Sequence, residues 1–566
     1  MNLHLSGIII TFLLTVALAF PFGKYIAAVF KGQKTITDFI APLERLIFRY
    51  CGIDIKKEMN WKQNLAALLS LNMLWFVYAF IMLLAQGSLF LNPDGNPSMS
   101  PDLSFNTAIS FLVNCNLQHY SGETGATYLT QLVVITFLQF VSAATGIAAL
   151  VIVLKAMSER STEKLGNFFE FFLKSITRIL LPLSIIVATL LVFNGTPASF
   201  AGKDTINTLE GKTVQVSRGP AAGMIAIKHL GTNGGGWFGA NSAHPLENPN
   251  YLTNMVEMIA QCLIPFALVF ALGFYINRKK LSYVIFGVMT LGMLMLLIPT
   301  IQAETLGNPG ITQLGIDQST GSMEGKEVRF GATASAYWSI MTTIISTGSV
   351  NSMHDSFMPV SQSMQLLAMM TNTFYGGCGV GILNYYIFII IAVFISGLMV
   401  GRTPEFLGRK IEAREMKIAT LIALLHPFLI LTGTALSSFV ITKNTSLSWL
   451  NNPGYHGFSE MLYEYTSSAA NNGSGFEGLG DNNPFWNIST GFVLILSRFL
   501  PIIGPVAIAG ILAKKKFIPE SAGTLRTDTG TFGIMTFGVI LIIAALAFFP
   551  ALVLGPLAEY FTLYHP

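Results

Sequence analysis

Long apolar stretches dominate the pattern of hydrophobic and polar positions along the chain. Ten of them reach the roughly 20 residues that a helix needs to cross the hydrocarbon core of a bilayer. They are expected at about 5–30, 64–90, 125–154, 179–199, 251–276, 281–302, 382–400, 418–442, 488–513 and 531–556. The pattern therefore predicts an all-α integral membrane protein with about ten transmembrane helices, surrounded by a lipid bilayer.

Composition excludes most other classes of protein. Charged residues make up 11% of the 566 positions and hydrophobic residues 52%, whereas soluble domains carry about 25% charged residues. A soluble enzyme or a disordered chain would need more charge, and a net charge of +4 is too small and dispersed for a nucleic-acid-binding face. The four cysteines are far apart and predict neither a disulfide framework nor a zinc site; they are Cys51, Cys115, Cys262 and Cys378.

Basic residues concentrate in alternate loops between the expected spans. Of the 33 lysines and arginines, 24 lie in the loops at 31–62, 155–178, 277–281, 401–417 and 514–526, and only seven lie in the loops on the opposite side. Because cytoplasmic loops carry an excess of basic residues, the five basic loops are expected in the cytoplasm. With ten spans, both termini are then expected outside.

Clusters of glycine, asparagine, threonine and serine recur four times in the loops expected outside. Each follows a half-apolar stretch that predicts a short helix, at about 103–113, 219–230, 332–345 and 458–470. The equivalent points Asn116, Gly234, Gly348 and Gly473 are separated by 118, 114 and 125 residues. A recurrence at such regular spacing indicates four copies of one unit, which is made of a span, a short helix, a polar turn and a second span.

The repeat predicts how the chain is divided. Residues 1–62 form the first span and a cytoplasmic loop, four pore units follow, and residues 527–566 form the last span. The four units are expected at 63–178, 179–280, 281–417 and 418–526.

The third unit departs from the pattern in the middle of its return span. Four glycines, which are costly in a helix, lie close together there: Gly376, Gly377, Gly379 and Gly381. They favour a movable gating loop below the filter; the alternative is a kink that serves packing only.

The polar turns have the composition that a dehydrated cation requires. Such an ion needs a ring of oxygens in place of its water, and backbone carbonyls supply one where glycine permits unusual φ/ψ angles. Non-helical backbone at membrane depth survives only where it is buried or lines a water-filled path. The C-terminal ends of the short helices would also favour a cation. Four such turns at matching spacing therefore predict a selectivity filter around one central pore.

Five sequence strings carry a resemblance to a known family. They are NCNLQHYSGETG (114–125), GTNGGGWFGANSAHP (231–245), STGSVNSMHDS (346–356), GRTPEFLGRKI (401–411) and NNGSGFEGL (471–479). Over essentially its whole length the chain resembles the KdpA family, the channel-like subunits of the bacterial Kdp potassium-pumping ATPase. The resemblance implies four non-identical channel-like units, folded from one chain around a pseudo-fourfold pore.

The resemblance also implies roles for individual residues. The K⁺-binding filter falls on Asn114, Cys115, Asn116, Thr232, Asn233, Gly234, Ser346, Thr347, Gly348, Asn471, Asn472 and Gly473. Cys115 stands where the family has a threonine, a change that a backbone carbonyl ligand tolerates. Gln118 matches a glutamine at the filter mouth that affects potassium affinity. Arg402 matches an arginine linked to the gating loop, and Arg498 matches an arginine inside the penultimate span.

The function implied is that of one subunit in an ATP-driven K⁺ uptake pump. The chain would bind K⁺ from outside and pass it sideways to the P-type ATPase subunit KdpB, with the accessory subunits KdpC and KdpF, in the bacterial cytoplasmic (inner) membrane. The chain itself is expected to bind no ATP and to be no enzyme. The segment Asp528-Thr529-Gly530-Thr531 is similar to the phosphorylated motif of P-type pumps but lacks its lysine.

Two alternatives differ in what they require. A stand-alone K⁺ channel or secondary K⁺ transporter of the same architecture would need no partner. A membrane enzyme that acts on lipid would need titratable residues that converge within the spans, whereas Lys24, Glu257, His426 and Arg498 are dispersed.

Three histidines each follow a filter strand: His119, His244 and His354. Their spacing is not a metal-ligand motif and favours a hydrogen-bonded outer vestibule. The neighbouring Glu123 and Asp355 indicate a mouth that attracts cations.

Overall fold

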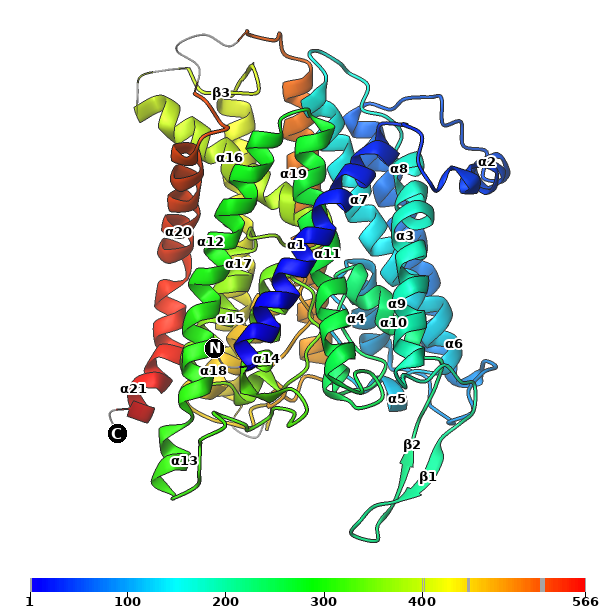
Figure 1. The fold of residues 1–566 in the computed structure, drawn as a ribbon, viewed down its shortest axis with the longest axis vertical. Helices are drawn as coiled ribbons and strands as arrows, with labels where there is room; N and C mark the ends of the chain where they lie inside the picture. The colour runs from blue at the N-terminus through cyan, green and yellow to red at the C-terminus, as the bar shows by residue number, and fades with distance from the viewer. Residues whose placement is uncertain (1–2, 400, 402, 445–447, 520–524, 565–566) are drawn as a thin grey trace.

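The computed structural model describes residues 3–399, 401, 403–444, 448–519 and 525–564, and these residues are mostly helical (Figure 1). Within them, ten helical segments are long and apolar enough to cross a membrane. They are α1 (Leu3–Phe30), α3 (Trp61–Ala85), α6 to α7 (Tyr128–Ser158), α8 to α9 (Phe168–Phe193), α11 (Tyr251–Tyr275), α12 (Lys279–Leu306), α16 (Val380–Met399), α17 (Ala413–Lys443), α19 (Pro484–Ala513) and α20 (Gly530–Leu552). The predicted all-α membrane fold is confirmed.

Shorter elements connect the spans. The four short helices expected ahead of the polar turns are α4 (Pro101–Leu112), α10 (Ala222–Leu230), α14 (Gly331–Ile345) and α18 (Tyr455–Ala470). The other helices are α2 (Ala41–Tyr50), α5 (Gly122–Gly125), α13 (Pro309–Gln313), α15 (Pro359–Thr371) and α21 (Ala558–Tyr564). Two antiparallel hairpins pair β1 (Asp204–Asn207) with β2 (Thr213–Val216), and β3 (Glu405–Phe406) with β4 (Arg409–Lys410).

The fourth span begins earlier than the sequence predicts. Arg178, expected in a basic loop, lies within the helix, where its guanidinium pairs with Glu44 at 2.6 Å and Asp38 at 2.7 Å. One turn earlier, Lys174 pairs with Glu170 at 2.6 Å. Because these carboxylates compensate the two positive charges, the helix continues through residues that hydropathy alone assigns to a loop.

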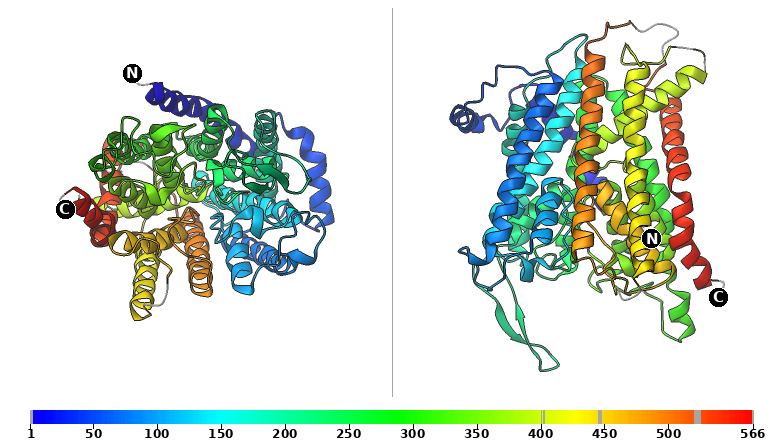
Figure 2. Two further views of the ribbon diagram at one scale, coloured as in Figure 1. Left: turned by 90° about the horizontal axis from the view of Figure 1, so that it is seen from below. Right: turned by 180° about the vertical axis from the view of Figure 1, so that it is seen from behind.

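The units surround a central axis in chain order, as the view along that axis shows (Figure 2, left). The first span lies obliquely across α11, and the two helices cross closely because Gly23 has no side chain. A Cβ at Gly23 would lie 2.8 Å from the Cβ of Phe270. The last long helix, α20, packs against α12, α15 and α16. The first and last spans therefore support the four units from outside the pore.

The two ends of the molecule differ in the loops that they carry. The elements α2 and β3, which belong to basic loops, lie at the upper end in Figure 1. The β1–β2 hairpin, α13 and both termini lie toward the lower end. The structure thus separates the loops as the distribution of basic residues predicts.

The return span of the third unit is broken, as the glycine cluster predicts. Helix α15 ends at Thr371 and α16 begins at Val380, with irregular backbone between them.

Candidate ion-binding pore

A short irregular segment, the filter strand, follows each of the four short helices, and the signs of its φ angles repeat in every unit. Its first and third residues have positive φ angles: Asn114 (64°) and Asn116 (57°), Thr232 (50°) and Gly234 (75°), Ser346 (60°) and Gly348 (82°), Asn471 (51°) and Gly473 (105°). The residue between them has negative φ in each case. This alternation of left- and right-handed residues turns successive carbonyl groups toward the same side of the strand, the arrangement that coordinates a dehydrated cation.

Backbone contacts between the strands close a ring. A Cβ added to any of three glycines would overlap a carbonyl oxygen of the next strand: Gly234 that of Thr347, Gly348 that of Asn472, and Gly473 that of Cys115. The fourth contact uses a side chain, because Asn116 Nδ2 donates to the Gly234 carbonyl at 2.7 Å. Asparagine tolerates the left-handed conformation better than most residues. The four strands therefore surround one axis in chain order.

Side chains at the second filter position point away from the ring. Asn233 Nδ2 donates to Asn114 Oδ1 at 2.7 Å and to Ser142 Oγ at 2.9 Å. Asn472 Nδ2 donates to the Thr342 carbonyl at 2.8 Å. These bonds fix the strands from behind, and the Thr232 and Gly234 carbonyls each accept one amide N–H at 2.7 Å.

Cys115 occupies an apolar position behind the first strand. It is fully buried and belongs to a hydrophobic cluster with Val113, Leu117 and Leu494. A cysteine behaves here as a small apolar residue, so the site needs no hydroxyl group at this position. The arrangement fits a role for the Cys115 carbonyl and none for its side chain.

A cavity opens at the end of the ring opposite the basic loops, termed the outer side, and Gln118 lies in its wall. Gln118 Nε2 donates to the Gly236 carbonyl at 3.3 Å, and the Gly236 N–H donates to Gln118 Oε1 at 2.8 Å. This paired contact joins the first unit to the second just beyond the filter strands. The glutamine therefore holds the first and second units together beside the cavity.

A buried ion pair that the sequence did not reveal secures the second strand. Lys228 on α10 pairs with Glu247, and both side chains are fully buried. Lys228 Nζ also donates to the Gly235 carbonyl at 3.0 Å, while Glu247 Oε1 accepts from the Phe238 N–H at 3.0 Å. Because the basic residues were assigned only to loops, this lysine could not be recognised as part of the pore wall.

The three histidines have different surroundings. His354 Nδ1 lies 2.8 Å from the Tyr463 hydroxyl, and burial lowers the pKa of His354 to about 3. His244 stacks on the Phe238 ring with centroids 4.0 Å apart. Glu123, expected to attract cations, accepts the Gly239 N–H at 2.7 Å.

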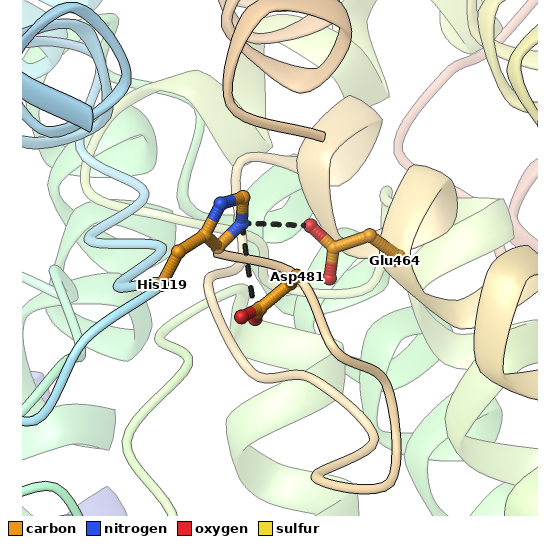
Figure 3. A group of neighbouring side chains, drawn as sticks. All are labelled: His119, Glu464 and Asp481. Carbon is orange, nitrogen blue, oxygen red and sulfur yellow. Dashed lines mark hydrogen bonds and ion pairs between the residues drawn. The ribbon is translucent and has the colours of Figure 1, made fainter. Parts of the chain in front are cut away.

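One ring nitrogen of His119 faces two carboxylates, as Figure 3 shows. Its Nε2 lies 3.2 Å from Glu464 Oε1 and 3.9 Å from Asp481 Oδ2, and its Nδ1 lies 2.6 Å from Asn487 Oδ1. Burial alone would lower the pKa of His119, but Asp481 and Glu464 outweigh it and raise the pKa to about 9. His119 is 345 positions from Glu464 and 368 from Asn487, so no local spacing could predict the group.

The glycine-rich break in the third unit lies against the inner end of the second strand. The Cys378 N–H donates to Thr232 Oγ1 at 2.9 Å, and its Sγ lies 3.4 Å from the Leu230 carbonyl oxygen. Gly379 approaches the backbone of Gly146 on α7 so closely that a Cβ would overlap the carbonyl oxygen. The sequence placed this loop below the filter, and the contacts agree with that position.

The loop and an arginine line a small space directly below the filter. The walls include Asn114, Ser346, Asn471, Gly377, Gly381 and Arg498. Arg498 is buried, and its Nη2 donates to the Ser142 carbonyl at 3.1 Å. Within the part of the chain that the structure describes, no carboxylate lies within ion-pair distance of this guanidinium. Arg402, the other candidate gating arginine, lies outside the described residues.

A second cavity continues sideways from this space. The two cavities share Asn372, Asn384 and Ser497 as wall residues. The second one extends between α17 and α20, where His426 and Phe548 lie in its wall. The region below the filter therefore adjoins a lateral cavity as well as the loop.

Comparisons with known proteins agree on the family. The family model described as the potassium-transporting ATPase A subunit, KdpA, matches residues 9–561. Proteins named potassium-transporting ATPase potassium-binding subunit are similar along the whole chain: those of Flavobacterium johnsoniae and Flavobacterium psychrophilum are 70% and 69% identical, with both chains covered completely. The protein of that name from Geobacillus kaustophilus is 47% identical over 98% of each chain.

A solved structure shares the fold. The potassium transporter TrkH from Vibrio parahaemolyticus aligns with a TM-score of 0.51 at 14% sequence identity, covering 89% of this chain and 98% of that one. At this level of identity the likeness concerns the architecture alone.

Proposed function

Because the chain belongs to the KdpA family of potassium-transporting ATPase A subunits, we propose that it is the potassium-binding, channel-like subunit of an ATP-driven K⁺ uptake pump. The observation that carries the proposal is the closed ring of four strands with alternately handed residues. A ring of this kind offers several carbonyl oxygens to one dehydrated ion.

The filter strands are proposed to bind K⁺ through their backbone. The carbonyl groups of residues 114–116, 232–234, 346–348 and 471–473 supply the oxygens, and the short helices point their C-terminal ends toward the same axis. The units that carry these strands are proposed to span 63–178, 179–280, 281–417 and 418–526. Because carbonyl dipoles rather than full charges hold the ion, it can leave as readily as it enters.

The ion is proposed to enter through the cavity beside Gln118. That end of the molecule lies opposite the basic loops, so it faces the outside of the bacterial inner membrane if those loops are cytoplasmic. Both termini then also lie outside.

Below the filter, the direct path is proposed to be closed and the lateral one used. The loop at 376–381 lies under the strands, and Arg498 places a positive charge in the space that an ion would enter next. A like charge repels K⁺ strongly where water is scarce. The lateral cavity lies between α17 and α20, two spans that are mostly exposed in this chain and against which a partner subunit can bind.

The partner is proposed to be a P-type ATPase subunit (KdpB), with KdpC and KdpF as accessory subunits. The test compares the purified chain with the assembled complex in lipid vesicles. We expect ATP-dependent K⁺ uptake by the complex, and neither ATP hydrolysis nor phosphate incorporation at Asp528 in the chain alone. Rapid K⁺ flux through the chain alone would favour a stand-alone channel and contradict the proposal.

A further inference from the structure

The three side chains around His119 have the separations of metal ligands. All three ligand atoms, His119 Nε2 and one carboxylate oxygen each of Glu464 and Asp481, lie within 4.8 Å of one another. The two distances from the histidine nitrogen are 3.2 Å and 3.9 Å. Zinc bonds of about 2.0–2.2 Å in a tetrahedral arrangement place neighbouring ligand atoms about 3.3–3.6 Å apart. A metal ion at the centre therefore needs only small movements of these side chains.

A chain of hydrogen bonds outside the group fixes which histidine nitrogen faces the carboxylates. Asn487 Nδ2 donates to Asp102 Oδ2 at 2.7 Å, so Asn487 Oδ1 points at His119 and accepts its Nδ1–H at 2.6 Å. Nε2 then faces Glu464, and the proton on Nε2 is the one that a metal ion would replace. A metal-binding histidine almost always donates its other N–H to an oxygen in this way.

The burial of the group leaves one side open. The side chains of His119 and Glu464 are 0% and 2% exposed, whereas that of Asp481 is 31% exposed and lines the outer cavity of the pore. Three protein ligands with a fourth position open to solvent allow a metal to bind and leave. The position also joins the loop of the first unit to α18 and the following loop of the fourth unit.

We propose that His119, Glu464 and Asp481 form a binding site for a divalent transition metal, represented by Zn²⁺, at the outer mouth of the pore. Mixed nitrogen and carboxylate ligands select such metals over K⁺, Mg²⁺ and Ca²⁺, which prefer oxygen ligands alone. The site is separate from the filter, and its existence does not depend on the proposed transport function.

A second group in the same region is less suited to a metal ion. His456, Asp355 and Glu460 pass the same test of distance. However, His456 Nε2 bonds Asp355 Oδ1 at 2.9 Å and its Nδ1 bonds Glu559 Oε1 at 3.0 Å. A carboxylate on each ring nitrogen stabilises the protonated ring of His456, so a metal ion displaces its proton less readily than the Nε2 proton of His119, whose Nδ1 faces only an amide oxygen. This histidine is therefore the matched control for His119.

Metal binding should reduce K⁺ uptake from the outside. The ion would neutralise two carboxylates beside the cavity through which K⁺ is proposed to enter, and so lower the local concentration of cations. It would also link the first unit to the fourth. We expect added Zn²⁺ to raise the K⁺ concentration required for half-maximal uptake.

The binding test uses the assembled complex in metal-free buffer at about pH 8, because protons compete with metals for these ligand atoms. Calorimetric titration with Zn²⁺ compares the wild type with Asp481→Asn, His119→Gln and the control His456→Gln. Any metal site on a partner subunit is common to all four samples. We expect both site variants to lose this binding event or weaken it by at least about tenfold, and the control to retain it. Replacing Zn²⁺ by Co²⁺ should give the visible absorption of a four-coordinate site in the wild type and the control alone.

The outcomes separate this proposal from the function of the pump. Asp481 is partly exposed, so Asp481→Asn should assemble normally even if His119→Gln does not. Equal Zn²⁺ binding by wild type and Asp481→Asn would overturn the proposal, as would the absence of binding to the wild type, which would make the group an ion pair only. In both cases the proposed function would stand, because it rests on the four filter strands and not on this group.

Discussion

On the outer side of the filter, side chains form bonds between several units. The inner side contacts a glycine-rich loop, at residues 376–381, that has few side chains. On the outer side, Asn116 bonds the Gly234 carbonyl, Gln118 pairs with the Gly236 backbone, and His119 meets Glu464 of the fourth unit. On the inner side, Cys378 makes the contacts of the glycine loop with the second strand.

This difference corresponds to two physical requirements of the proposed filter and gate. Selection among ions requires oxygens held at fixed positions, and bonds between units provide that. Release requires a segment that can move at low cost, and few bonds with much glycine lower the free energy of local rearrangement. Substitutions at the two sides should therefore change different properties of transport.

The largest effect is expected from Gly234→Ser in the filter. The new Cβ would overlap the Thr347 carbonyl oxygen, and the left-handed φ of 75° becomes strained. The strained φ angle costs about 1–2 kcal/mol, and the displacement of the carbonyl oxygen adds to that cost. We therefore expect the apparent K⁺ affinity to fall at least about thirtyfold. We also expect Rb⁺, NH₄⁺ or Na⁺ to be transported more readily. Uptake assays across K⁺ concentrations, with Na⁺ as competitor, measure both.

The matched control for this substitution is Gly223→Ser on α10. Gly223 is exposed, and nothing lies within 4 Å of an added Cβ. We expect wild-type transport from it. If Gly234→Ser kept the wild-type affinity and selectivity, the ring would not be the site that selects K⁺.

On the inner side, Gly379→Ala should increase leak rather than change affinity. Its Cβ would overlap the Gly146 carbonyl oxygen at a φ of 81°. A cost of about 1–2 kcal/mol should raise the population of the displaced loop about five- to thirtyfold. K⁺ flux into vesicles without ATP measures the leak, with Gly287→Ala as the control because its added Cβ meets nothing within 4 Å. An unchanged leak would leave the loop a packing role only.

A smaller effect is expected from Gln118→Arg at the mouth. The substitution removes the paired contact with Gly236 and adds a positive charge in a water-filled cavity. At about 4 Å in water the repulsion is about 1 kcal/mol, which should weaken apparent K⁺ affinity about fivefold. Gln118→Ala removes the contact without adding charge, so the difference between the two variants isolates the electrostatic part. Equal K⁺ affinity in Gln118→Arg and Gln118→Ala would show that the added charge does not affect K⁺ binding.

The substitution with the smallest expected effect on transport tests which end of the protein faces the outside of the cell. Leu209, at the tip of the β1–β2 hairpin, is fully exposed, and the native Cys51 is exposed at the opposite end. In intact cells, Leu209→Cys should react with an impermeant thiol reagent while Cys51 does not, and transport should be unchanged. Lys326 is unsuitable as an outer marker because its side chain is buried against Glu304 at 2.9 Å. The reverse labelling pattern would invert the proposed direction of uptake.

Local features of the sequence determined the architecture. The length of each apolar stretch specified ten spans, because the thickness of the bilayer fixes the number of apolar residues that a spanning helix requires. The spacing of the polar turns indicated four units, and the glycines at 376–381 located the break between α15 and α16. Glycine at Gly234, Gly348 and Gly473 permits the positive φ angles found there.

Only the tertiary structure decided which distant residues meet. Lys228 pairs with Glu247 inside the pore wall, and the carboxylates of Glu44 and Asp38 allow a helix to include Arg178. His119 reaches Glu464 across 345 positions. Attraction between such groups depends on their separation in space and on the loss of surrounding water. Neither quantity is a property of a short stretch of sequence, so these contacts become visible only when the units are packed around their common axis.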